Sequence, residues 1–171
     1  PSLALLSLGA APPSAERLGV SKDIAAACEG RDGWSDPAPP AHIHGRSWYV
    51  GTCGITVVLV ETDAGLVLIN TGPGEAAPPV LANIRALGFD PRQIKWLLMT
   101  HEHFDHVGGM AAIQQATGAR LAVGPNAAEV MRSGKPDRQD PQAAGLADHS
   151  MAPVRVDRNL RSGASLTVGG T

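Results

Sequence analysis

Apolar and polar positions alternate along the chain in short blocks that predict a series of strands. Two segments, HIHGRSWYVG and ITVVLVET, are rich in β-branched and aromatic residues, and TCG between them is a turn signal. Because ITVVLV is continuously apolar after its threonine, we expect that strand to be buried on both faces. Further strands are predicted at LVLIN, KWLLMT, RLAVG, VRV and SLTV.

Helical periodicity predicts three helices between these strands. The first carries four apolar residues on one face, at Val80, Leu81, Ile84 and Leu87. Its first turn tolerates Pro78 and Pro79, and Gly88 suits a left-handed cap at its end. The second spans Gly108 to Gly118, and the third follows Asn126 as its cap. Residues 134–153 predict a long polar loop. Because strands and helices alternate, we expect the α/β (α+β) class with a mixed sheet.

The N-terminal part of the chain differs in composition from the rest. Residues 1–14 begin with an apolar run followed by small residues, which is typical of the end of a signal peptide. A short apolar helix is the alternative, and the run is too short to span a bilayer. Residues 15–41 predict an extended arm with a short helix near SKDIAAACEG, and we expect residues 42–171 to be the N-terminal portion of the main domain. A signal peptide predicts a periplasmic or secreted protein.

Charge and cysteine content narrow the classes of partner. The formal net charge is -2, and the lysines and arginines are scattered. This pattern predicts neither nucleic-acid nor membrane binding, so we expect a small-molecule substrate. We also expect a monomer. Cys28 and Cys53 are the two cysteines. In an exported protein an even number favours a disulfide, and two unpaired structural cysteines are the alternative.

Residues with metal-binding side chains are concentrated in THEHFDH, directly after the apolar run KWLLMT. Neutral imidazole and carboxylate are common zinc ligands. A regular strand would direct His106 away from the other three residues, so we expect a loop that brings them together. His101 and His103 would then hold one zinc ion, and Asp105 and His106 a second.

The segment THEHFDHVGG resembles the H-x-H-x-D-H signature of the metallo-β-lactamase superfamily. The segments GWSDPAPP, SWYVGTCGI, VLANIRALGFD and DRQDPQ extend this resemblance to subclass B3, in the Adelaide-imipenemase-type branch. The resemblance covers roughly residues 28–171. It implies the N-terminal half of an αββα sandwich, with the C-terminal half and the remaining zinc ligands beyond residue 171.

The resemblance implies zinc-dependent hydrolysis of the β-lactam amide bond in penicillins, cephalosporins and carbapenems by a metal-bound hydroxide, and hence antibiotic resistance. It implies zinc ligation by His101, His103, Asp105 and His106, with Asp105 also catalytic. It further implies a substrate contact at Gln142 and a disulfide between Cys28 and Cys53. The alternatives are a lactonase or a glyoxalase-II-like thioesterase of the same fold, or an inactive truncated fragment. Residues 1–171 alone are expected to be poorly stable and nearly inactive.

One position departs from the superfamily pattern. Asn70 in LINTGP stands where many members have aspartate. Asparagine has no charge and one acceptor oxygen fewer, so we expect weaker zinc binding. His149, the only histidine after the motif, and the pair His42 and His44 lie outside any matching pattern, and we do not expect them to bind metal.

Overall fold

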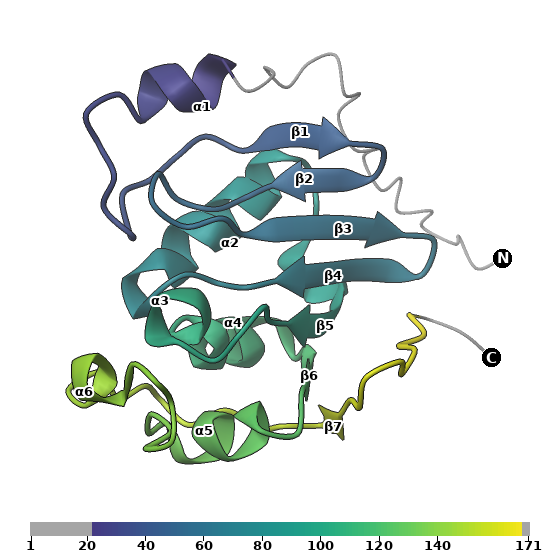
Figure 1. Ribbon diagram of the computed structural model, residues 1–171. Coiled ribbons are helices and arrows are strands. Elements are labelled where there is room, and N and C mark those ends of the chain that lie inside the picture. The colour runs from purple at the N-terminus through teal and green to yellow at the C-terminus, as the bar shows by residue number, and fades with distance from the viewer. Residues whose placement is uncertain (1–21, 169–171) are drawn as a thin grey trace, which may run out of the picture.

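The computed structural model describes residues 22–168, in which seven strands form one sheet (Figure 1). The strands are β1 (Ala41–His44), β2 (Ser47–Tyr49), β3 (Val58–Thr62), β4 (Gly65–Ile69), β5 (Ile94–Leu98), β6 (Arg120–Val123) and β7 (Arg158–Asn159). Their order in the sheet is the order in the chain. Pairing is antiparallel from β1 to β4 and parallel from β4 to β7. The mixed sheet confirms the predicted class. The predicted signal peptide at residues 1–14 lies outside the described residues.

Except for the helix before β1, the helices connect the parallel strands, and they lie mainly on one face of the sheet. They are α1 (Lys22–Ala27), η2 (Gly74–Ala76), α2 (Ala77–Ala86), η3 (Pro91–Gln93), α3 (Phe104–Val107), α4 (Met110–Thr117), α5 (Ala127–Ser133) and α6 (Ala143–Leu146). Figure 1 shows α2 and α4 together behind the sheet. Between residues 22 and 168, no helix combines the length and the apolar character needed to cross a bilayer.

The main hydrophobic core lies between the sheet and the helices α2 and α4. Leu59, Leu68 and Leu97 from the strands have no exposed surface, and neither do Val80 and Ile113 from the helices. Burying each such side chain contributes about 1.5–3 kcal/mol. This core therefore fixes the position of β5, whose C-terminal end leads into the histidine-rich segment.

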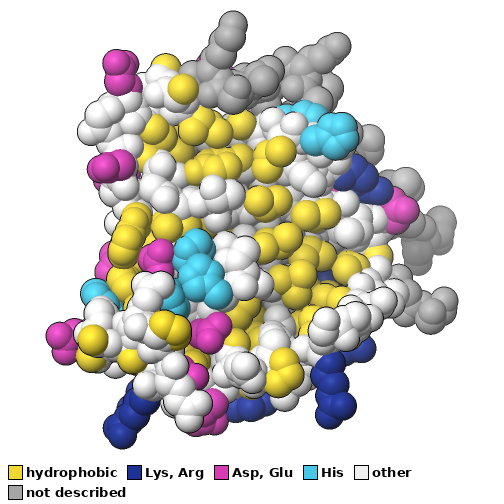
Figure 2. Space-filling model, viewed as in Figure 1, with side chains coloured by type: hydrophobic (Ala, Val, Ile, Leu, Met, Phe, Trp, Pro, Cys, Tyr) yellow, Lys and Arg dark blue, Asp and Glu magenta, His cyan; other side chains and the backbone are white. Residues whose placement is uncertain are grey.

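The opposite face of the sheet is less well covered. Its cluster of buried residues contains only Val67, Trp96 and Ala122. Around it lie apolar residues that are only partly buried, at Val60, Ile69, Leu98, Leu160, Leu166 and Val168. Figure 2 shows hydrophobic side chains running down this face. The prediction that ITVVLV is buried on both faces is therefore wrong: in the described residues no helix covers this side of β3.

Several predicted elements differ from those observed. HIHGRSWYVG forms two strands rather than one, because Gly45 adopts a positive φ of 53° and turns the chain between β1 and β2. VRV and SLTV are not strands, and within residues 22–168 strand β6 pairs only with β5 and the short β7. The predicted loop 134–153 contains α6. Asn126 precedes α5, but its side chain makes no capping hydrogen bond.

The N-terminal arm is attached to the sheet at several points. Cys28 and Cys53 form the predicted disulfide, with Cα atoms 5.4 Å apart. The Cys53 N–H donates to the Asp36 carbonyl at 2.8 Å. From α2, the buried Asn83 side chain donates to the Ala38 carbonyl at 2.9 Å. These contacts fix the course of the arm, including Trp34.

Candidate metal centre

The histidine-rich segment lies where the buried strand β5 ends. His101 and His103 are in the connection after β5, and His103 is the residue before α3. Asp105 and His106 lie in α3 itself, which is a single helical turn. Sequence reasoning predicted a loop for the whole segment. Instead, the helical turn α3 places Asp105 and His106 beside the two histidines of the connection.

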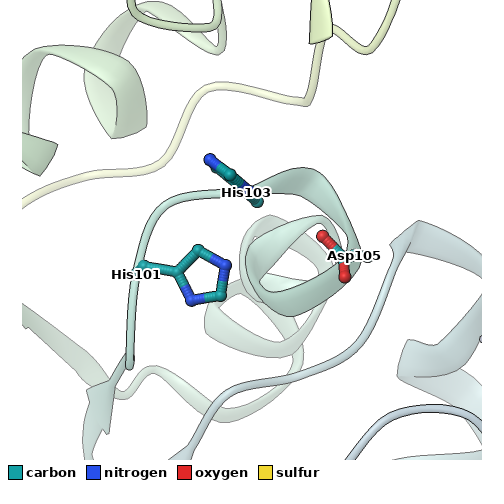
Figure 3. A group of neighbouring side chains, drawn as sticks. All are labelled: His101, His103 and Asp105. Atoms are coloured by element: carbon teal, nitrogen blue, oxygen red, sulfur yellow. The ribbon is translucent and has the colours of Figure 1, made fainter. Parts of the chain in front are cut away.

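Three of the predicted ligands converge on one centre (Figure 3). Ligand atoms of His101, His103 and Asp105 all lie within 4.8 Å of one another. His106 lies beside this group, with its Nε2 3.3 Å from Oδ2 of Asp105. Its ring centroid is 4.2 Å from that of His101. Asp105 therefore lies next to His106, its expected partner, and also next to the expected pair His101 and His103.

The side chain of Thr100 determines which nitrogen of His101 is free. Thr100 Oγ1 lies 3.1 Å from His101 Nδ1 and 3.2 Å from the acceptor Oδ1 of Asn70, to which it donates. The hydroxyl therefore accepts from His101 Nδ1, which leaves Nε2 with its lone pair. Two imidazole nitrogens and a carboxylate oxygen are the kinds of ligand atom that zinc commonly binds. These residues fit a divalent metal ion.

Asn70 connects the end of β4 to both halves of the histidine segment. It is 5% exposed and has a positive φ of 64°, a conformation that asparagine tolerates better than most residues. Its Oδ1 accepts from the Thr100 N–H at 3.0 Å, and its Nδ2 lies 3.2 Å from His106 Nδ1. The next residue, Thr71, donates its N–H to the His106 carbonyl at 2.8 Å. Asn70 thus occupies the supporting position predicted for it.

Burial influences the charge of the centre. It lowers the pKa of the His106 imidazole, and the positive charges that His101 and His103 can carry lower it further. The carboxylate of Asp105 opposes this effect. His106 is therefore mainly neutral near pH 7, which is the form of imidazole that binds metals.

Asp140 is a residue of this site that sequence reasoning missed. Its Oδ2 lies 2.9 Å from His103 Nε2, although the two residues are 37 positions apart. Gln142, the predicted substrate contact, is exposed at the start of α6, and its backbone N–H donates to Asp140 Oδ1 at 2.6 Å. Both residues lie in DRQDPQ, the segment that the family resemblance had already singled out. Nothing in the sequence indicated that Asp140 contacts His103.

Aromatic side chains lie beside the centre. Phe104 makes an edge contact with Trp34 of the arm, with ring centroids 5.5 Å apart. On Phe104 the ring of His149 is stacked at 3.9 Å. His149 is thus not a member of the metal-ligand group. His42 and His44 lie on β1, where His42 Nε2 is 2.8 Å from the Gly45 carbonyl oxygen.

The fold and the set of candidate metal ligands indicate one protein superfamily. The profile of the Metallo-beta-lactamase superfamily matches residues 50–169, and the chain belongs to this superfamily. The chain has the metallo-β-lactamase fold and carries the residues of a His-x-His-x-Asp motif that could hold a metal ion.

The chain is similar to solved structures of subclass B3 enzymes. The metallo-β-lactamase MIM-1 from Novosphingobium pentaromativorans has a TM-score of 0.82 and 55% identity, over 86% of this chain and 54% of that one. BJP-1, a subclass B3 metallo-β-lactamase of Bradyrhizobium japonicum, has a TM-score of 0.71 and 34% identity, over 80% and 50%. The chain thus spans about half the length of these proteins, and its fold corresponds to half of theirs.

Among curated relatives, the chain matches shorter segments. A hydroxyacylglutathione hydrolase from Ectopseudomonas mendocina is 50% identical over 58 residues, which cover 34% of this chain and 21% of that protein.

Proposed function

We propose that this chain contributes to a zinc-dependent β-lactamase of subclass B3, which hydrolyses the amide bond of β-lactam antibiotics. The observation that carries this proposal is the 55% identity to MIM-1, which extends over 86% of this chain. The match to the hydroxyacylglutathione hydrolase covers only 34% of the chain. Similarity along most of the chain is the stronger argument for a shared substrate class.

In this proposal the residues of the centre have separate roles. His101, His103, Asp105 and His106 supply four of the ligands for two zinc ions. Bound zinc would lower the pKa of a water molecule to near 7 and polarise the attacked carbonyl. Asp105 has two carboxylate oxygens, so one can bind a cation while the other accepts a hydrogen bond from the attacking water.

The surroundings of the centre are consistent with a small-molecule substrate. Gln142 is exposed at the start of α6, next to Asp140, and we assign it to the mouth of the substrate site. Trp34 is 48% exposed beside Phe104, so an apolar surface adjoins the same region. The disulfide between Cys28 and Cys53 supports export to an oxidising compartment such as the periplasm.

A thioesterase is the second candidate, because the hydroxyacylglutathione hydrolase is 50% identical over its matched segment. The full-length gene product should be assayed with a chromogenic cephalosporin, a carbapenem and a glutathione thioester, each with and without a chelator. We expect chelator-sensitive turnover of both β-lactams and little turnover of the thioester. Thioester hydrolysis without β-lactam turnover would replace the proposed function by the second one.

A further inference from the structure

The contact between His103 and Asp140 joins the centre to a part of the chain that contributes no ligand to it. Asp140 lies between α5 and α6, and its Oδ2 is 2.9 Å from His103 Nε2. Both side chains are mostly buried, with 15% of His103 and 16% of Asp140 exposed. An aspartate side chain with hydrogen-bond donors beside it is ionised at neutral pH.

The two oxygens of this carboxylate have different partners. Oδ1 accepts from the Gln142 N–H at 2.6 Å, which closes a tight turn two residues long. The Asp140 carbonyl accepts from the Ala143 N–H at 2.9 Å, so the following residues are held as well. Oδ2 is thereby directed at His103 by the local backbone.

An ionised carboxylate accepts hydrogen bonds and cannot donate them. His103 must therefore carry its proton on Nε2, and in the neutral ring Nδ1 has the lone pair. Nδ1 is then the atom of His103 that is free to bind a cation together with His101 and Asp105. Carboxylates that accept from a ligand histidine fix both its tautomer and its ring orientation.

We propose that Asp140 is a positioning residue of the metal centre, which holds His103 through Nε2 so that Nδ1 faces the metal. This inference rests on the proposed metal-dependent function. An alternative is that the contact only attaches the segment between α5 and α6 to the rest of the fold. The same segment offers a matched control for this alternative.

The control is Asp137, three residues before Asp140. Its Oδ1 accepts from the Gln139 N–H at 2.9 Å, which is the same type of turn. Among the described residues, its carboxylate has no hydrogen bond to a histidine. Asp137→Asn and Asp140→Asn therefore remove the same charge from the same segment. Only Asp140→Asn leaves a single amide oxygen where two carboxylate oxygens each accepted a hydrogen bond, so its NH2 group can face His103 Nε2.

The test compares the full-length protein with these two variants. Zinc affinity is measured by chelator competition, and the tautomer of His103 in the metal-free protein by ¹⁵N NMR of the imidazole at pH 8. We expect the Nε2–H tautomer in the parent and in Asp137→Asn, and a mixture of tautomers in Asp140→Asn. We also expect Asp140→Asn to bind one zinc ion about tenfold more weakly, while Asp137→Asn binds as the parent does.

Unchanged zinc affinity and tautomer in Asp140→Asn would overturn the inference and leave the proposed function intact. Equal losses of affinity in both variants would also overturn it, because they would indicate a purely structural role. If the parent itself bound no zinc, both the inference and the proposed function would fail. Circular dichroism of the metal-free proteins shows whether each variant is folded.

Discussion

At the scale of single residues, His106 differs from the other two histidines of the centre. The Thr100 N–H at 3.0 Å fixes Oδ1 of Asn70, so Nδ2 of the amide faces His106 Nδ1 at 3.2 Å. An amide nitrogen donates, and Nδ1 must therefore accept. A neutral His106 then carries its proton on Nε2, the nitrogen that lies 3.3 Å from Asp105. Binding a metal through Nε2 requires this arrangement to change.

Replacing Asn70 by aspartate should remove this conflict. One carboxylate oxygen would still accept from the Thr100 N–H, and the other would accept from His106 Nδ1–H, which frees Nε2 for a metal. We expect Asn70→Asp to raise the affinity for the more weakly bound zinc ion by about tenfold. Competition titration of the full-length protein measures this change.

The matched control is Asn159→Asp, which adds the same charge on the exposed strand β7. It should leave zinc affinity as it is in the parent. If Asn70→Asp binds zinc no more tightly than the parent, the amide orientation does not limit metal binding.

At the scale of elements, the sequence predicted correctly those features that depend on neighbouring residues in the chain, such as the two ends of helix α2. Pro78 and Pro79 stand in the first turn of α2, and Gly88 follows its end with a φ of 84°, as expected from the sequence. VRV and SLTV had suitable strand composition, but strand formation depends on the neighbouring strand, and only Arg158–Asn159 finds one.

In the site as well, features that depend on nearby residues were predicted, and contacts between distant residues were not. His101, His103 and Asp105 could be recognised as candidate ligands because they lie within five residues of one another in the sequence. Asn70 could be singled out only through the family resemblance. Asp140 could not be assigned to the site, because its contact with His103 depends on how the segment after α5 folds back.

Another interaction between distant elements gives a prediction for stability. The buried Asn83 amide of α2 donates to the carbonyls of Ala38 at 2.9 Å, and of Val50 and Gly51 at 3.2 Å. Asn83→Ala leaves these acceptors without their partner, so we expect a loss of about 1–3 kcal/mol in the free energy of unfolding. Urea denaturation followed by circular dichroism measures it.

Asn126→Ala serves as the comparison, because the Asn126 side chain makes no capping hydrogen bond. This variant should change the free energy of unfolding by less than about 0.5 kcal/mol. Equal losses in the two variants would show that the amide of Asn83 does not anchor the arm.

At the scale of the whole molecule, the two faces of the sheet are covered unequally. Leu97 and Leu98 are neighbours on β5 and point to opposite faces. Leu97 is fully buried in the main core, whereas Leu98 is only partly buried beside the small cluster. The same substitution at these two positions therefore compares the packing on the two faces of the sheet.

We expect Leu97→Ala to lower the free energy of unfolding by about 2–5 kcal/mol, because it opens a cavity in the packed core. Leu98→Ala should lower the free energy of unfolding by less than half as much, because the Leu98 side chain is already partly exposed to water. Urea unfolding of both variants measures the difference. Equal costs would contradict the unequal covering of the two faces.

The order of the strands also bears on how the molecule is assembled during synthesis. In the described residues every strand after β1 pairs with the one that left the ribosome immediately before it. Each new strand therefore meets a template that already exists, and no pairing between named strands has to wait for a segment translated later. The segment that carries the histidines emerges after β5 has a partner, so its anchoring strand can be in place before β6 is made.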